Sequence, residues 1–144
     1  MRINGLWCLC DDGVTRPIIR GRLETADGTR KWAEFLVDVG ADRTVLNAAT
    51  VVEAGLTLYD AEEAVSGLGG VAETKTVETV IYLPRETDQA VAFRGQFTAV
   101  TEAAALEINV LGRDILDLFS VIVDRPGDVV CLLSQKHRYL IIQE

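Results

Sequence analysis

Short runs in which apolar and polar residues alternate recur along the chain, and they predict β-strands. The first two runs cover Pro17 to Thr25 and Arg30 to Val37, where every second residue from Ala33 onward is apolar. The connection between them, Ala26 to Thr29, contains a glycine where a hairpin turn favours positive φ. We therefore predict a β-hairpin over residues 17–37, and its second strand leads directly into Asp38.

Further strands are predicted along the rest of the chain, and two brief helices interrupt them. The strands are Thr74 to Leu83, Val91 to Val100 with an interruption at Gly95, Ile108 to Gly112, Ser120 to Val123, Val129 to Leu133 and Tyr139 to Ile142. Asn47 is a candidate N-cap for a helix that runs through Ala54 and stops at Gly55. A second, amphipathic helix is predicted from Arg113 to Phe119. Many short strands with one or two helices favour an all-β fold, a small closed or nearly closed barrel, and residues 1–144 are expected to form a single domain.

Composition and charge narrow the class of partner and the compartment. The chain is 49% hydrophobic and 25% charged, as is ordinary for a globular protein, and its net charge of -8 argues against nucleic acid as a partner. No apolar run approaches the roughly 20 residues of a membrane span, so no membrane partner is expected. The first ten residues have too short an apolar stretch for a secretion signal, and three cysteines do not suggest a disulfide framework. We expect a cytoplasmic protein.

The segment that follows the predicted hairpin carries the clearest chemical signal. A buried-looking apolar strand ends in Asp38, and a lone buried carboxylate loses its hydration, which chains accept mainly where the acid has a function or a partner. The residues Asp38-Val39-Gly40-Ala41-Asp42-Arg43-Thr44-Val45-Leu46 resemble the active-site loop of retropepsin-like aspartic proteases. That family signature is Asp-Thr/Ser-Gly-Ala, an acid, a variable residue, Thr and two aliphatic residues. Val39 is the one departure, because the family carries Thr or Ser there.

Two more segments extend the resemblance over about Pro17 to Leu133. Ser66-Gly67-Leu68-Gly69-Gly70-Val71 lies where the family places its flap, the hairpin that closes over substrate, although glycine clusters of this kind are also common in plain hairpin turns. Val110-Leu111-Gly112-Arg113-Asp114 is similar to the family segment that precedes the C-terminal helix. The resemblance implies a partly buried ion pair between Arg113 and Asp42. The alternative is a strand that ends in a helix whose acidic Asp114 favours the helix dipole.

The resemblance implies an aspartic endopeptidase that needs two carboxylates, one acting as base on a water and the other as acid. The only other Asp-x-Gly, Asp11-Asp12-Gly13, lacks the aliphatic pair and indicates a solvated turn. A symmetric homodimer would therefore supply Asp38 twice. Relatives build much of their interface from terminal strands, for which residues 6–9 and 139–142 are candidates, although either could close its own barrel. No cofactor is implied.

Roles for the remaining loop residues also come from the resemblance. Asp42 and Gly40, beside Ala41, would hold the backbone of a peptide or protein substrate or shape the loop, and Arg43 would favour acidic substrate residues. The four residues 67–70, Gly67, Leu68, Gly69 and Gly70, would cover the substrate. In relatives the Thr or Ser hydroxyl reaches across the dimer axis, and Val39 cannot replace that hydrogen bond. Two alternatives therefore stay open: a weak or inactive module for dimerisation or peptide binding, and a barrel with a structural buried aspartate.

Other chemistries have weaker signals. Cys8, Cys10, Cys131 and His137 lack a zinc-type spacing, so buried free thiols and no metal site are expected. His137, the single histidine, lies in a polar tail and precedes no recognisable nucleophile, which makes a Ser-His-Asp or Cys-His enzyme improbable.

Overall fold

The strands and helices follow the predicted order closely. The computed structural model describes residues 1–61, 65–67 and 70–134. Its strands are β1 (Arg2–Asn4), β2 (Leu6–Leu9), β3 (Thr15–Glu24), β4 (Arg30–Val37), β5 (Val45–Leu46), β6 (Tyr59–Asp60), β7 (Val65–Gly67), β8 (Gly70–Ala72), β9 (Thr74–Pro84), β10 (Ala90–Val100), β11 (Asn109–Leu111), β12 (Ser120–Asp124) and β13 (Val129–Leu133). Two α-helices, α1 (Ala48–Ala54) and α2 (Arg113–Leu116), and a 3-10 turn, η1 (Ala103–Ala105), complete the described elements.

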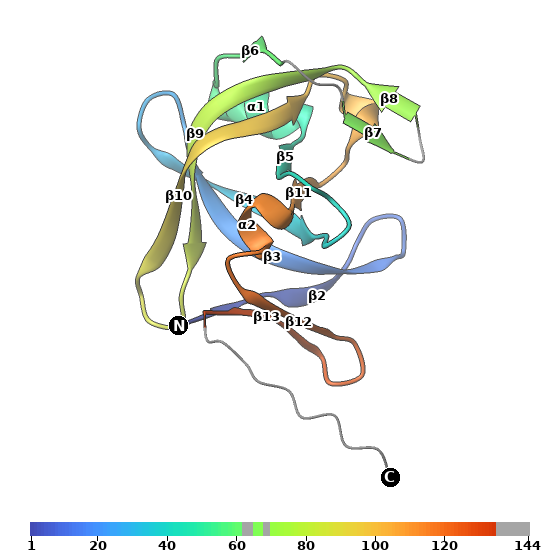
Figure 1. Cartoon of the computed structure of the whole chain (residues 1–144), viewed down its shortest axis with the longest axis vertical. Coiled ribbons are helices and arrows are strands. Elements are labelled where there is room, and N and C mark those ends of the chain that lie inside the picture. The colour runs from blue at the N-terminus through green and yellow to red at the C-terminus, as the bar shows by residue number, and fades with distance from the viewer. Residues whose placement is uncertain (62–64, 68–69, 135–144) are drawn as a thin grey trace.

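The largest sheet closes on itself. Its strands follow the order β2-β3-β4-β11-β5-β10-β9-β6, and a further pairing of β3 with β9 joins the two ends of the run β3-β4-β11-β5-β10-β9 into a ring (Figure 1). Most neighbours are antiparallel, but β11 runs parallel to β4 and β5 runs parallel to β10. The all-β closed barrel with two short helices that the sequence predicts is therefore confirmed.

Apolar side chains on the inner face of the ring form the core. Large side chains that are fully buried there are Phe35, Leu23, Ile81, Leu83 and Leu111. The pattern on β4 shows why the sequence predicts this face, because Ala33, Phe35 and Val37 are buried and the residues between them are exposed or half-buried. Burial of a side chain of this size contributes about 1.5–3 kcal/mol to folding, so these alternating positions determine the register of the strand.

Helix α1 covers one end of the barrel and has the caps that the sequence predicts. The Asn47 Oδ1 accepts a hydrogen bond from the Thr50 N–H at 2.9 Å, and Gly55 ends the helix in the left-handed conformation at φ 64°. Val51 and Ala54 bury their side chains against the core. Asn47 also binds Asn109 of β11, whose Oδ1 accepts the Asn47 N–H at 2.9 Å, so the cap ties the helix to the barrel.

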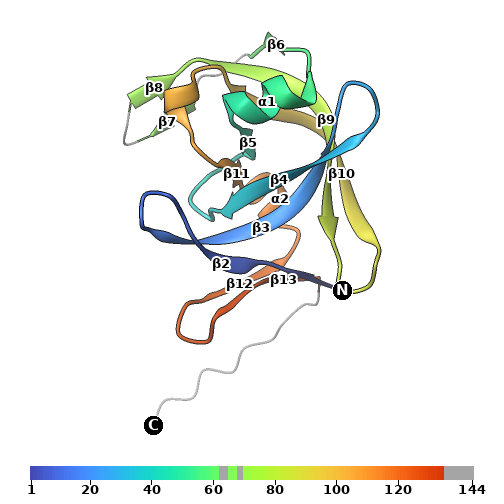
Figure 2. The same cartoon turned by 180° about the vertical axis from the view of Figure 1, so that it is seen from behind.

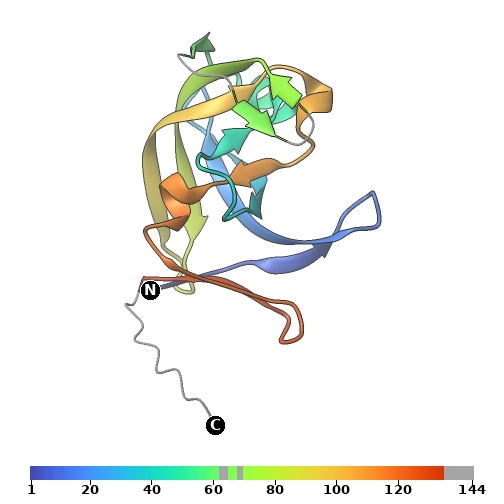
Figure 3. The same ribbon diagram turned by 45° about the vertical axis from the view of Figure 1, so that its right-hand side comes forward.

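A second, smaller sheet lies below the barrel in Figure 1 and has the order β1-β13-β12. Strands β12 and β13 form a hairpin through the turn Arg125 to Asp128, as predicted, and β1 pairs with β13 of the same chain. The hairpin contacts β2 through the Trp7 Nε1, which donates to the Asp124 carbonyl at 3.1 Å. Figures 2 and 3 show β2 between this sheet and β3. The segment 6–9 thus joins the sheet of its own chain, whereas segment 139–142 lies outside the described residues.

Two boundary predictions are wrong. Gly95 does not interrupt its strand, because β9 and β10 pair without a break over eleven residues and Gly95 lies opposite Thr79. The predicted helix Arg113 to Phe119 ends at Leu116, since the chain must turn at once to enter β12 at Ser120. Leu118 shows the consequence, because it is apolar yet 64% exposed. Among the described residues, the helices are too short and polar for any of them to span a membrane.

Candidate active site

Asp38 lies immediately after β4, in a tight turn that holds its carboxylate. The Asp38 Oδ1 accepts the Gly40 N–H at 2.9 Å, and the Asp38 carbonyl accepts the Ala41 N–H at 3.2 Å. The Asp38 N–H donates to the Leu111 carbonyl at 3.2 Å, which fixes the start of the turn to β11. The expectation that Asp38 is buried is wrong for the single chain, in which it is half-buried. The strand is buried, but the turn leaves it toward the surface.

The next two residues of the turn lie at the surface. Val39 is 58% exposed and Gly40 is exposed as well. A Cβ at Gly40 would lie 3.2 Å from the Asp38 Oδ1, so a side chain there would press on the carboxylate. An apolar side chain and a carboxylate thus stand next to each other on the open side of the loop.

The far end of the loop is anchored by Thr44 and Asp114. The Asp114 carboxylate accepts the Thr44 N–H at 2.9 Å and the Thr44 hydroxyl at 2.7 Å, while its Oδ1 also accepts the Ile115 N–H at 3.0 Å. The Thr44 Oγ1 in turn accepts the Gly112 N–H at 3.1 Å. Thr44 has no exposed surface, so its polar groups depend on these partners. The sequence motifs included both residues, but they predicted no contact between them.

Close packing of the backbone completes the connection between the loop and α2. The Ala41 carbonyl accepts the Arg113 N–H at 2.8 Å, and the Asp42 carbonyl accepts the Asp114 N–H at 3.2 Å. A Cβ at Gly112 would collide with the Arg43 backbone carbonyl and the Thr44 nitrogen. Only glycine lets the strand end pass this close to the loop. The loop is therefore held at both ends, at β11 and at α2.

Arg113 and Asp42 are in contact, but the pair is exposed rather than partly buried. The Arg113 Nη2 forms a hydrogen-bonded ion pair with the Asp42 Oδ1, and the two side chains are 47% and 80% exposed. Ion pairs in water contribute about 0–1 kcal/mol, because hydration and side-chain entropy offset the attraction. The pair thus orients the loop more than it stabilises the fold. Arg43, the neighbour of Asp42, is exposed.

The glycine-rich segment forms a hairpin, of which the tip is not described. Strands β7 and β8 are antiparallel, and Gly67 lies opposite Gly70. Leu68 and Gly69 lie outside the described residues. In Figures 1 and 3 the β7–β8 hairpin lies above the loop that joins β4 to β5. Its position is thus on the same side of the barrel as the Asp38 turn.

The competing candidate residues lie elsewhere. Asp11-Asp12-Gly13 is an exposed turn in which Arg16 binds Asp12 at 2.6 Å and holds the pKa of that carboxyl at about 2. Cys131 is buried, but Cys8 and Cys10 are only half-buried, which corrects the expectation of three buried thiols: they lie at the end of an edge strand. His137 lies outside the described residues, and within those residues no cluster of His, Cys, Asp and Glu could hold a metal ion.

The protein-family and structure comparisons agree on one class of protein. Residues 14–123 match the family model described as retroviral aspartyl protease. No curated protein matches the sequence. Among solved structures, the chain is similar to EIAV protease complexed with the inhibitor HBY-793, with 23% identity, coverage of 71% of this chain and 86% of that chain, and a TM-score of 0.55. It is also similar to a retropepsin-like aspartic protease from Rickettsia conorii, with 16% identity, coverage of 92% and 97%, and a TM-score of 0.59. These likenesses establish a shared fold.

Proposed function

The chain belongs to the retroviral aspartyl protease family, and we propose that it is an aspartic endopeptidase in which two copies each contribute Asp38. The observation that supports this proposal most is the state of the Asp38 turn. Hydrogen bonds from three backbone positions define the turn, yet Asp38 is only half-buried and Val39 is 58% exposed. The Asp38 loop of one chain supplies one of the two carboxylates that an aspartic protease needs.

A second copy related by a two-fold axis would complete the site. The two Asp38 carboxylates would face each other and share one proton, since two carboxylates about 3 Å apart cannot both ionise. The ionised Asp38 takes a proton from a water, and the oxygen of that water bonds to the carbonyl carbon of the peptide. The protonated Asp38 gives its proton to the carbonyl oxygen. The first Asp38 then gives the proton it took from water to the amide nitrogen as the C–N bond breaks, and a hydroxyl of the tetrahedral intermediate gives its proton to the second Asp38, which restores the shared proton.

Substrate would lie along the loop as an extended peptide. Backbone groups of Gly40 to Asp42 would bind its main chain, and the β7–β8 hairpin would cover it. The exposed Arg43 would favour substrates with acidic side chains. Two surface pockets, one at Arg20, Trp32, Ala33 and Glu34 and one at the β9–β10 turn, include no residue of this loop. Neither pocket lies at the Asp38 loop, as expected if the substrate cleft forms only between two copies of the chain.

Val39 supports a second candidate function. The valine has no hydroxyl to bond across the axis, and its exposed side chain offers an apolar contact instead. A module that dimerises or binds peptides without cutting them would keep such a contact and lose the rigid placement of the dyad. The two functions differ in whether peptide bound at the loop is cleaved.

A cleavage assay on a mixed peptide library tests the proposal directly. The wild-type protein should cut peptides with a bell-shaped pH profile whose optimum lies on the acid side of neutral, because the fully protonated and fully ionised pairs are both inactive. Asp38→Asn should lower the rate by about a hundredfold or more while the fold, followed by circular dichroism, is unchanged. Cleavage that persists in Asp38→Asn, or that rises steadily into alkaline pH, would contradict the dyad. A folded wild-type dimer that binds but never cuts would favour the second candidate.

A further inference from the structure

The outer face of the barrel carries a row of aromatic and cationic side chains that includes no residue of the Asp38 turn. Arg22 of β3 lies opposite Trp32 of β4 and also opposite Tyr82 of β9, so the three residues form one row across three strands. The Arg22 guanidinium lies over the Trp32 ring, 4.7 Å from its centroid, and Trp32 is 65% exposed. A guanidinium that stacks by its face keeps the N–H donors of its edge available.

A pocket of about 190 Å³ opens at the end of this row, where Arg22 and Tyr82 meet the turn between β9 and β10. Arg85 brings a second guanidinium to the same pocket. Pro84 and Ala90, which pair across the hairpin, supply apolar wall, and Asp88 supplies one negative charge. In Figure 1 this turn lies at the lower left, beside the N-terminus.

The two arginines have unused donors. The Arg85 Nε is buried, and the described residues offer it no hydrogen-bond acceptor, while its Nη1 donates to the Gln89 Oε1 at 3.1 Å. Among the described residues, the Arg22 side chain contacts the Trp32 ring and forms no hydrogen bond or ion pair. A buried donor without an acceptor costs about 1–3 kcal/mol, so an acceptor in the pocket that the Arg85 guanidinium turned to meet would recover that cost. The combination indicates a site for an anion.

The pocket wall is fixed before any ligand arrives. The Tyr82 hydroxyl donates to the Glu24 Oε2 at 2.7 Å, and the Arg30 guanidinium lies 3.8 Å from the centroid of the Tyr82 ring. The Trp32 ring packs against the Arg22 guanidinium. Side chains that are already positioned lose little conformational entropy on binding.

We propose that this pocket binds the carboxylate of an acidic side chain in an extended peptide segment, as an exosite separate from the Asp38 loop. A planar carboxylate matches the fork of a guanidinium, and the apolar walls suit the methylene groups of a glutamate. Asp88 repels a doubly charged phosphate more strongly than a singly charged carboxylate. The partner is thus an acidic protein segment, and its binding requires no cleavage chemistry.

A titration with two blocked peptides tests the site, one with three consecutive glutamates and one with glutamines in their place. Asp38→Asn protein, in which peptide would not be cut, is titrated at low ionic strength by calorimetry and by the NMR signal of the Arg85 Nε–H. The glutamate peptide should bind and shift that signal, and the glutamine peptide should not. Arg22→Gln and Arg85→Gln should each weaken binding by about tenfold or more, because each removes a charge-assisted hydrogen bond.

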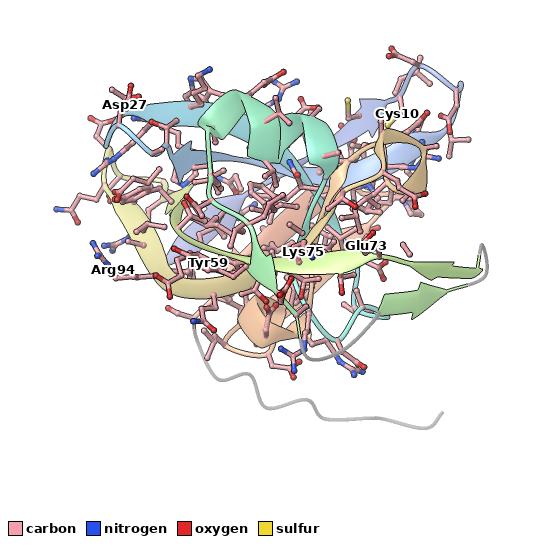
Figure 4. All side chains as sticks on the ribbon, turned by 90° about the horizontal axis from the view of Figure 1, so that it is seen from above. Cys10, Asp27, Tyr59, Glu73, Lys75 and Arg94 are labelled. Carbon is pink, nitrogen blue, oxygen red and sulfur yellow. The ribbon has the colours of Figure 1, made fainter. Side chains whose placement is uncertain are left out.

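Arg94→Gln is the matched control. Arg94 is an exposed arginine on β10 that does not line the pocket, and Figure 4 shows it at the edge of the barrel. Its loss should change the affinity by no more than about twofold, as expected for a remote surface charge. The proposal is overturned if the glutamate peptide does not bind in the millimolar range, or if Arg94→Gln weakens binding as much as Arg22→Gln. Binding of inorganic phosphate in preference to the glutamate peptide would also overturn it. Should Arg85→Gln fail to fold, Arg22→Gln decides.

Discussion

The sequence predicts the role of Asp38 but not the exposure of its neighbour Val39. An aspartate at the end of an apolar strand is a candidate catalytic acid, because a buried carboxylate is costly unless it has a function or a partner. The exposure of Val39, at 58%, could not be predicted from the same residues, since it depends on the direction in which the turn leaves β4. This exposure changes the meaning of the substitution. A surface valine is free to take part in an interface, whereas a buried one would only fill space.

Val39→Thr is expected to strengthen dimerisation and cleavage together. The hydroxyl would be solvated in the single chain, because position 39 is exposed there, so the folded chain should keep its stability. In the proposed dimer the hydroxyl would bond across the axis, and each bond contributes about 1 kcal/mol, or about fivefold in the dimer dissociation constant. Analytical ultracentrifugation and the peptide assay measure the two effects.

Val39→Ala is the control that distinguishes the effect of adding a hydroxyl from the effect of removing the valine side chain. It removes apolar surface and adds no hydrogen bond, so it should weaken the dimer or leave it unchanged. If Val39→Thr instead weakens the dimer as Val39→Ala does, the valine makes an apolar contact across the interface. The binding module would then be the better function for this chain.

At the scale of the elements, the loop, β11 and α2 form one interlocked unit. The sequence predicts all three and their order, but it could not show that the Asp114 carboxylate holds Thr44, because that contact joins residues 70 positions apart. The sequence also predicts too much burial for the ion pair of Arg113 with Asp42, because that burial depends on what lies outside the loop. The predicted helix caps at Asn47 and Gly55 are confirmed, because a cap depends on residues within a few positions of each other.

Gly112→Ala is expected to destabilise the chain and to displace the loop. Its Cβ would meet the Arg43 carbonyl and the Thr44 nitrogen, which are backbone atoms that cannot move aside without breaking the Thr44–Asp114 contacts. Overpacking of this kind costs about 1–3 kcal/mol. Urea denaturation measures the loss, and Gly95→Ala is the control, since no atom lies within 4 Å of a Cβ there. Equal stability of the two variants would contradict the close approach at Gly112.

The β3–β4 turn predicts a loss of folding stability at low pH. The Asp27 Oδ1 accepts hydrogen bonds from the Thr25 hydroxyl, from the Thr29 N–H at 3.0 Å and from the Thr29 hydroxyl at 2.7 Å. These bonds, that of Thr25 first, lower the pKa of Asp27 from 3.8 to about 2. Because the pKa is depressed in the folded state, the stabilisation is present above about pH 4 and is lost as the pH falls toward 2. Asp27→Asn should therefore flatten the decline of the urea midpoint between pH 4 and pH 2, whereas an unchanged decline would locate the acid-sensitive contacts elsewhere.

At the scale of the whole molecule, the strand pattern was enough to predict a closed barrel, but not how it closes. The ring depends on the pairing of Arg22 and Leu23 with Tyr82 and Ile81, and nothing local in β3 or β9 indicates that partner. The same pairing places Arg22 beside Arg85 and creates the exosite pocket. Charge totals hid this feature, because a net charge of -8 says nothing about where the cations gather.

A mixing experiment tests whether two whole chains form the active unit. Each chain has one Asp38, and the only other Asp-x-Gly of the sequence begins at Asp11, in an exposed turn where the neighbouring Asp12 binds Arg16. Subunits of Asp38→Asn added to wild-type protein should exchange into dimers that hold a single carboxylate. At concentrations well above the dimer dissociation constant, random pairing with an equal amount of the variant should lower the cleavage rate to about half, and a ninefold excess to about a tenth. Asp11→Asn protein is the matched control for this addition, because it keeps Asp38 and should raise the rate. A rate that stays constant when Asp38→Asn is added would mean that one chain acts alone, and the shared-proton mechanism would then be wrong.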